Sequence, residues 1–86
     1  MEIVLLPVAD EHLFYWQKTK RKNILKKIST LIKAIIENPY TGIGKPEPLR
    51  HQLAGKWSRR IDSKNRIVYL IENNTLYIYS LKGHYE

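Results

Sequence analysis

The sequence predicts an α+β domain in which helices pack on one face of an antiparallel β-sheet. Residues 66–72 and 75–81 are rich in β-branched and aromatic side chains, and the Asn-Asn pair between them tolerates the positive φ of a tight hairpin turn. Residues 24–36 instead carry isoleucine and leucine at the three-and-four spacing of an amphipathic helix. With 86 residues, 43% of them hydrophobic, the chain suits one core, so we expect a single domain over residues 1–86.

The N-terminal part of the chain predicts one strand followed by two helices. Residues 2–6 form a short apolar run that Pro7 ends, and Asp10 is placed to cap a short first helix. Thr19 can cap the second helix, which the Asn-Pro pair at 38–39 ends. The apolar stripe of this second helix is expected to cover the sheet.

The second helix also carries a strongly basic outer face. Opposite its apolar stripe lie five lysines whose charge is not balanced by an equal number of acidic partners one turn away: Lys20, Lys22, Lys26, Lys27 and Lys33. A solvated face would explain them, but their unbalanced charge favours phosphate contact for part of this surface. The whole chain has 15 Lys and Arg against eight Asp and Glu, a net charge of +7 that attracts RNA or acidic protein segments.

Several classes of site and location are excluded by composition. The absence of cysteine excludes disulfides and thiolate metal sites, and the three histidines are too scattered for a zinc cluster, so we expect no metal and no cofactor. His12, in the first turn of a helix, is expected to be a surface residue. The N-terminal apolar run is too short for a membrane span and lacks a signal peptide's basic start, which predicts a cytoplasmic protein with no membrane contact.

The loop at residues 40–49 holds one carboxylate between two prolines. Because the prolines fix the backbone on either side, Glu47 should be held rigidly. Flanking cations, Lys45 and Arg50, would keep the carboxylate ionised and able to accept a proton, although a plain connector would also explain the loop. Residues 49–53 are expected to form a short strand after it.

The C-terminal third predicts a three-stranded meander, with residues 57–62 as the strand before the hairpin. If Glu72 pairs with Thr75, Arg66 lies opposite Leu81 on the face away from the core. Residues 82–86 would then emerge beside Arg66, bringing a cation, an imidazole and a phenol together at one edge. A solvated edge is the alternative explanation for such a polar tail.

Five short segments along the chain carry a family resemblance. They are Tyr-Trp-Gln at 15–17, Gly-Lys-Pro-Glu-Pro-Leu at 44–49, Trp-Ser-Arg-Arg-Ile at 57–61, Arg-Ile-Val-Tyr at 66–69 and Gly-His-Tyr at 83–85. Together they resemble the YoeB (Txe) toxins of the RelE superfamily over nearly the whole chain. The resemblance implies a RelE-like fold, a twisted antiparallel sheet with two N-terminal helices on one face. It also implies a ribosome-dependent mRNA endonuclease that forms homodimers and is neutralised by a cognate YefM- or Axe-like antitoxin.

Carried onto matching positions, the resemblance implies a role for each of four residues. Glu47 would be the general base, Arg66 the phosphate-binding cation, His84 the general acid and Tyr85 a substrate-positioning residue. These roles suit RNA cleavage, in which the 2′-hydroxyl loses a proton, the phosphate gains charge and the 5′ oxygen leaves. No metal is needed for such a reaction.

Two further residues and one departure complete the comparison with the family pattern. Arg59 and Arg60 match it, and either phosphate contact or a structural salt bridge would explain them. Arg59 and Lys45 are the candidates for RNA binding. Glu86 follows the tyrosine that usually ends the motif, and it adds an anion beside the expected phosphate site. The alternatives are a non-catalytic RelE- or ParE-like protein that inhibits a target by binding, and a ribonuclease that needs no ribosome. A carboxylate and an imidazole placed together favour catalysis, because binding alone requires neither.

Overall fold

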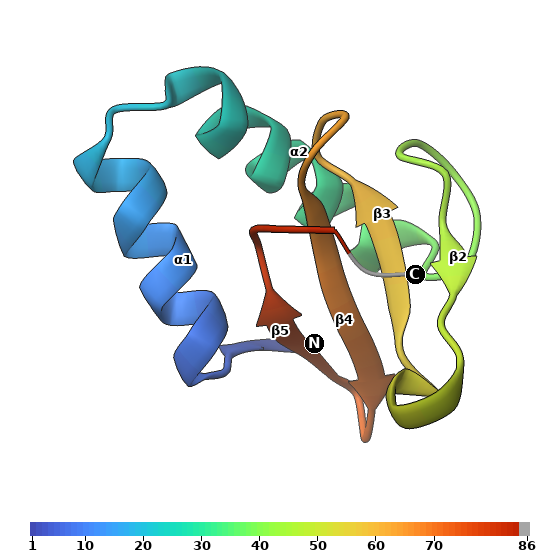
Figure 1. Ribbon diagram of the computed structural model, residues 1–86. Coiled ribbons are helices and arrows are strands. Elements are labelled where there is room, and N and C mark those ends of the chain that lie inside the picture. The colour runs from blue at the N-terminus through green and yellow to red at the C-terminus, as the bar shows by residue number, and fades with distance from the viewer. Residues whose placement is uncertain (85–86) are drawn as a thin grey trace.

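The computed structural model describes residues 1–84 and shows a five-stranded sheet with two helices packed on one face (Figure 1). In chain order the elements are β1 (Glu2–Leu5), α1 (Pro7–Lys18), α2 (Lys22–Glu37), β2 (Glu47–Pro48), the 3₁₀ turn η1 (His51–Leu53), β3 (Trp57–Arg60), β4 (Arg66–Glu72) and β5 (Thr75–Ser80). The strand order is β1-β5-β4-β3-β2. The predicted α+β architecture is confirmed, with the difference that β1 runs parallel to β5, which makes the sheet mixed.

The β4–β5 hairpin forms as the sequence predicts. Glu72 pairs with Thr75, and the two turn residues, Asn73 and Asn74, have φ values of 53° and 56°. Asparagine adopts this left-handed conformation more readily than most residues, and two such residues in succession give a tight turn with the twist of the flanking strands. β3 then pairs antiparallel with β4, so the predicted meander is confirmed.

A β-bulge makes the far end of the hairpin differ from the prediction. Val68 pairs with Ser80 although the next residue of β4 pairs with Ile78, so β5 has one extra residue at this point. Because side chains alternate along a strand, the extra residue reverses the faces beyond it. Leu81, expected opposite Arg66 on the outer face, is fully buried in the core instead.

Three predicted local features in the first two thirds of the chain are wrong. The first helix begins at Pro7, before Asp10, because proline has no N–H to leave unsatisfied at the first helical position. Thr19 does not cap the second helix but ends the first, where its hydroxyl donates to the Tyr15 carbonyl at 2.8 Å. The predicted strand at residues 49–53 is replaced by the 3₁₀ turn η1.

The hydrophobic core lies between the two helices and one face of the sheet. Its buried members are Ala9, Trp16, Ile24, Ile28, Leu31, Ile35, Ile61, Ile67, Tyr69, Leu76, Ile78 and Leu81. The helix stripe and the inward strand residues therefore meet as their periodicities predict. Neither helix of the described chain is both long and apolar enough to cross a membrane. The opposite face of the sheet carries polar residues such as Ser58, Arg60 and Arg66 beside the buried Val68.

Candidate active site

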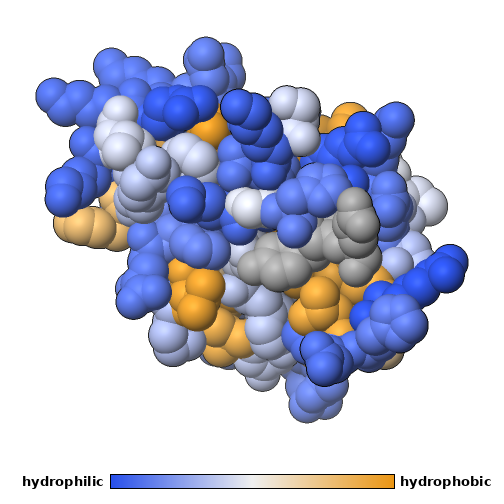
Figure 2. Space-filling model, in the orientation of Figure 1, coloured by the Kyte–Doolittle hydropathy of each residue, from blue (hydrophilic) through white to orange (hydrophobic). Residues whose placement is uncertain are grey.

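A groove of about 710 Å³ is lined by residues of β2, β3, β4 and the chain after β5. It is lined by Glu47, Pro48, Leu49, Arg50, Arg60, Arg66 and His84. The strand register explains this gathering, because Glu47 pairs with Ser58 while Arg60 pairs with Arg66. Residues directly opposite each other point to the same face of a sheet. The surface seen in Figure 2 is largely hydrophilic, with apolar residues in small separate patches.

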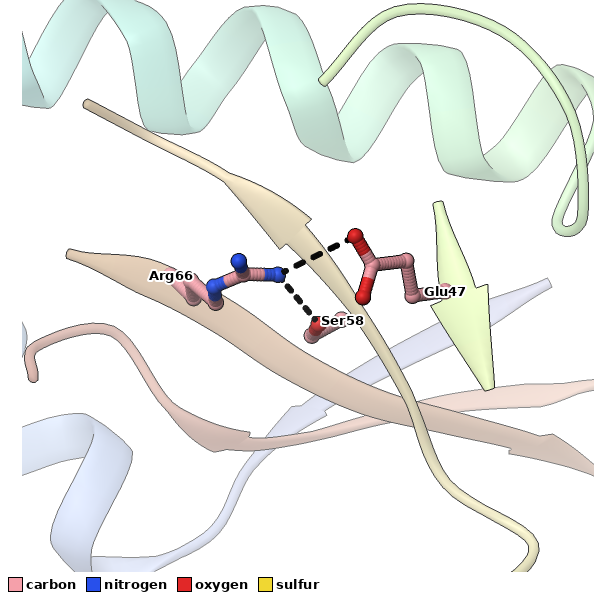
Figure 3. A network of polar contacts seen from close by, with 3 residues as sticks. All are labelled: Glu47, Ser58 and Arg66. Atoms are coloured by element: carbon pink, nitrogen blue, oxygen red, sulfur yellow. Dashed lines mark hydrogen bonds and ion pairs between the residues drawn. The ribbon is translucent and has the colours of Figure 1, made fainter. Parts of the chain in front are cut away.

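Arg66 lies at the buried side of this groove. Its side chain is only 7% exposed, its Nη1 donates to Ser58 Oγ at 3.2 Å, and the same nitrogen lies 3.9 Å from Glu47 Oε1 (Figure 3). Its Nε is buried and has no hydrogen-bond partner within the described part of the chain. A guanidinium keeps its charge at any relevant pH, so burial with few partners is costly. Such a cation is suited to take an additional anionic partner.

Glu47 faces Arg66 from the opposite side of the groove, at the edge of the sheet. Its side chain is 52% exposed, so the carboxylate is open to a ligand while it still contacts the arginine. The backbone beside it is fixed, because Leu49 is buried and its N–H donates to the Lys56 carbonyl at 2.9 Å. The rigid placement that the sequence predicts for this carboxylate agrees with these contacts.

The chain after β5 carries His84 to the same groove. Gly83 adopts a φ of 94°, a conformation that favours glycine, and its N–H donates to Asn65 Oδ1 at 2.9 Å. Its carbonyl accepts a hydrogen bond from the Arg66 N–H at 3.0 Å. His84 is exposed and lines the groove. The structure therefore brings Glu47, Arg66 and His84 together, whereas Tyr85, like Glu86, lies outside the described residues.

Arg59 is placed on the other face of the sheet, where RNA cannot reach it. It is fully buried, and its Nε donates to the Tyr69 hydroxyl at 3.2 Å. Its remaining nitrogens donate to three backbone carbonyls, those of Ile43 at 3.2 Å, Thr41 at 2.9 Å and Asn38. These contacts tie the loop after α2 to the sheet. The RNA-binding role predicted for Arg59 does not fit this placement, because the side chain is fully buried and each of its three nitrogens is bonded within the protein.

Arg60 and Arg50 are the groove residues that the sequence prediction missed. Strand alternation could have found Arg60, because it follows a residue of the inward face and must point outward. The sequence predicts Arg50 only as a cation that flanks Glu47, whereas in the structure it also lines the groove. Lys45 is exposed but does not belong to the described groove lining.

The groove as a whole has a cationic character. Three arginines and one carboxylate line it, and Arg60 lies directly opposite Arg66 on the neighbouring strand. Like charges opposite each other repel, and an anion between them relieves the repulsion. Within residues 1–84 no group of three or more His, Asp or Glu side chains is arranged to hold a metal ion. The arrangement can therefore bind a phosphate beside an available base and an imidazole.

Sequence comparison matches nearly the whole chain to one family of proteins. The profile of the YoeB-like toxins of bacterial type II toxin–antitoxin systems matches residues 7–85. Toxin YoeB of Synechocystis is 49% identical over 75 residues, which cover 87% of both chains. Toxin YoeB of Escherichia coli is 49% identical over 76 residues, which cover 88% of both.

Solved structures agree with the sequence comparison. The YoeB/ParE toxin from Agrobacterium tumefaciens is similar with a TM-score of 0.94 and 34% identity, over 99% of this chain and 100% of that one. A YoeB dimer from Staphylococcus aureus has a TM-score of 0.90 and 42% sequence identity to this chain. A YoeB–YefM complex from the same organism has a TM-score of 0.89 and 42% identity. Each match covers 99% of this chain and 98% of the other. The predicted RelE-like fold is confirmed by these likenesses.

Proposed function

Because this chain belongs to the YoeB-like toxins of bacterial type II toxin–antitoxin systems, we propose that it is an endoribonuclease that cleaves mRNA on the ribosome. The observation that supports this activity is the groove in which Glu47, Arg66 and His84 meet. A carboxylate, a buried cation and an imidazole are the three groups that RNA cleavage through the 2′-hydroxyl requires. A protein that inhibits by binding alone has no need to place them together.

The proposed reaction begins with the carboxylate and ends with the imidazole. Glu47 takes the proton of the 2′-hydroxyl, and the 2′ oxygen forms a bond to the adjacent phosphorus. Arg66, assisted by Arg60, binds the phosphate oxygens as negative charge grows on them. The bond from phosphorus to the 5′ oxygen then breaks, and His84 gives a proton to that oxygen. The products are a 2′,3′-cyclic phosphate and a 5′-hydroxyl, and no metal or cofactor takes part.

Two of the remaining predicted residues keep a place in this proposal. Tyr85 follows the general acid directly, and we assign it to positioning the substrate by stacking on a base or binding a phosphate. Lys45 is exposed and suits a contact with the RNA backbone beyond the groove. Arg59 is replaced in the RNA-binding set by its neighbour Arg60, which faces the groove.

The proposed partners follow from the relatives and from charge. A relative from Staphylococcus aureus forms a complex with YefM and another structure of it is a dimer. We assign this chain a YefM- or Axe-like antitoxin with an acidic and apolar segment, which suits a toxin of net charge +7, and a homodimeric state. The chain is placed in the cytoplasm, where translating ribosomes are found.

The activity is tested by removing the base without changing the shape of its side chain. Glu47→Gln should lower the rate of cleavage of translated mRNA by about two to four powers of ten, because an amide cannot accept the 2′-hydroxyl proton. The matched control is Glu72→Gln, which changes an exposed carboxylate at the far end of β4 and should keep the original rate. Equal rates for the two variants would remove Glu47 from the mechanism. Cleavage of naked RNA at the same rate would instead favour the ribosome-independent alternative.

A further inference from the structure

Helix α1 holds the chain just after β5 by two hydrogen bonds to a single residue. His12 Nδ1 accepts the Leu81 N–H at 3.1 Å, and Trp16 Nε1 donates to the Leu81 carbonyl at 2.9 Å. His12 and Trp16 are one helical turn apart, so both side chains extend from the same face of α1. Both backbone polar groups of the fully buried Leu81 are thus satisfied by one helix. We call this arrangement the Leu81 clamp.

The Leu81 clamp lies three residues before the proposed general acid. Beyond it the path is fixed by Asn65, which accepts the Gly83 N–H, and by the Arg66 N–H, which donates to the Gly83 carbonyl. Ser80 Oγ adds a bond to the Lys82 carbonyl at 3.0 Å. With every backbone residue from 80 to 83 tied down, the position of His84 depends on where Leu81 is held.

We propose that His12 is a positioning residue for catalysis, whose neutral imidazole holds Leu81 so that His84 reaches the groove. This inference rests on the proposed function, because it assumes that His84 is the general acid. Trp16 supplies the matching bond from a buried position, and it carries no titratable group. His12 is therefore the member of the Leu81 clamp that can change with conditions.

The direction of that change follows from the hydrogen bond itself. A backbone N–H can only donate, so Nδ1 must be unprotonated and the neutral ring carries its proton on Nε2. Burial lowers the pKa of His12 below its usual 6.5, the positive charge of Lys82 lowers it further, and Glu11 on α1 acts in the opposite direction. Lys82 itself lies over the Tyr15 ring, with 4.9 Å from Nζ to the ring centre.

Acid should therefore open the Leu81 clamp. A pKa that is lower in the folded state than in the unfolded one gives stability that is complete above about pH 6.5 and is lost as the pH falls below it. Protonation would place a second donor against the Leu81 N–H. The bond would break and the residues that carry His84 would lose one of their anchors.

The test compares His12→Asn with His12→Ala. The Oδ1 of asparagine can take the place of Nδ1 as an acceptor and does not titrate, whereas alanine removes the acceptor. Two quantities are measured from pH 5 to 8: the protection of the Leu81 amide against hydrogen exchange, and the rate of cleavage of translated mRNA. His51→Asn, on the exposed turn η1, is the matched control and should leave both unchanged.

We expect His12→Ala to lose Leu81 protection and to cleave about 10- to 100-fold more slowly at pH 7.5, since a small displacement of a catalytic group has effects of this size. His12→Asn should keep both at neutral pH. Between pH 8 and pH 5, Leu81 protection should fall in the original chain and should stay constant in His12→Asn. The inference would be overturned if His12→Ala kept the Leu81 amide protection and the cleavage rate of the original chain. It would also be overturned if Leu81 protection in the original chain did not fall as the pH is lowered.

The experiment separates this inference from the proposed function. If the original chain cleaves no translated mRNA, the function fails, while Leu81 protection still decides whether His12 holds the tail. If His12→Ala does not fold, the comparison between the original chain and His12→Asn at pH 5 and 8 gives the same decision.

Discussion

Arg59 and Arg60 are neighbours in sequence, but β3 directs them to opposite faces of the sheet. Arg59 is fully buried and bonded to the Tyr69 hydroxyl and to backbone carbonyls, whereas Arg60 is exposed in the cationic groove. A buried cation held by several acceptors supports the fold, and an exposed one opposite another arginine is free to bind phosphate. One residue type thus has two unrelated tasks.

The same substitution should affect mainly stability at Arg59 and mainly activity at Arg60. Arg59→Ala should lower the free energy of unfolding by about 3 kcal/mol or more, because it removes a fully buried side chain whose hydrogen bonds join the Tyr69 hydroxyl and three loop carbonyls. Arg60→Ala should change stability by less than about 1 kcal/mol and slow the cleavage of translated mRNA. Urea unfolding and cleavage rates of both variants check this. A stable Arg59→Ala protein with slow cleavage would return Arg59 to the RNA-binding set.

Short connections between elements place the tail as firmly as the strands do. The turn after β3 is held by Asp62, whose Oδ1 accepts the N–H groups of Lys64 at 2.8 Å and Asn65 at 2.7 Å. Asn65 in turn accepts the Gly83 N–H, so this turn is one of the anchors of the chain that carries His84. Partial burial acts to raise the pKa of Asp62, but these hydrogen bonds and Arg21 outweigh it, and the pKa is lowered.

Asp62→Ala tests whether this turn stabilises the protein through the ionised carboxylate. We expect a loss of about 1 kcal/mol at pH 7, the usual contribution of such hydrogen bonds. Because the folded pKa is below the ordinary 3.8, the contribution of Asp62 is present above that pH and is lost as the pH falls through the folded value. Urea unfolding of both proteins from pH 3 to 7 should therefore show curves that converge in acid. A constant difference would assign the effect to the turn geometry instead.

Elements whose signals are local are predictable from this sequence, and those that depend on distant contacts are not. The Asn-Asn turn and the isoleucine periodicity of α2 depend on nearby residues, and both match the structure. The cap of α2 was misplaced because the hydroxyl of Thr19 serves the end of α1. The bulge in β5 could not be foreseen, because it accompanies the burial of Leu81 against Trp16, 65 positions away.

In the candidate site too, features set by nearby residues are predictable and those set by distant contacts are not. Parity along β4 was enough to place Arg66 on the outer face beside the tail, and the family motif indicated Glu47 and His84. Burial of Arg66 was not foreseen, since it depends on Ser58 and on the chain after β5. The sequence also does not predict which of Arg59 and Arg60 faces the groove, because that depends on the register of β3 against β4.

For the whole molecule, a net charge of +7 combines with one groove, and among residues 1–84 the carboxylate that lines it is Glu47. Under the proposed function, general attraction would draw the protein to RNA, and the groove would supply a base, a phosphate-binding cation and an acid within one fold. The charge would serve a binding protein equally well. The chemistry of the groove is therefore what distinguishes an endoribonuclease from a binding protein.

The most direct measurement is to map the ends of mRNA cleaved during translation, with and without a chelator. Attack by the 2′-hydroxyl predicts a 2′,3′-cyclic phosphate on one fragment, a 5′-hydroxyl on the other, and the same rate when divalent ions are removed after the ribosomes have been stabilised by polyamines. A 5′-phosphate product would mean that water attacks the phosphorus. So would a cleavage rate that depends on the divalent ion concentration when the ribosomes are stabilised by polyamines. The roles of Glu47 and His84 would then be contradicted.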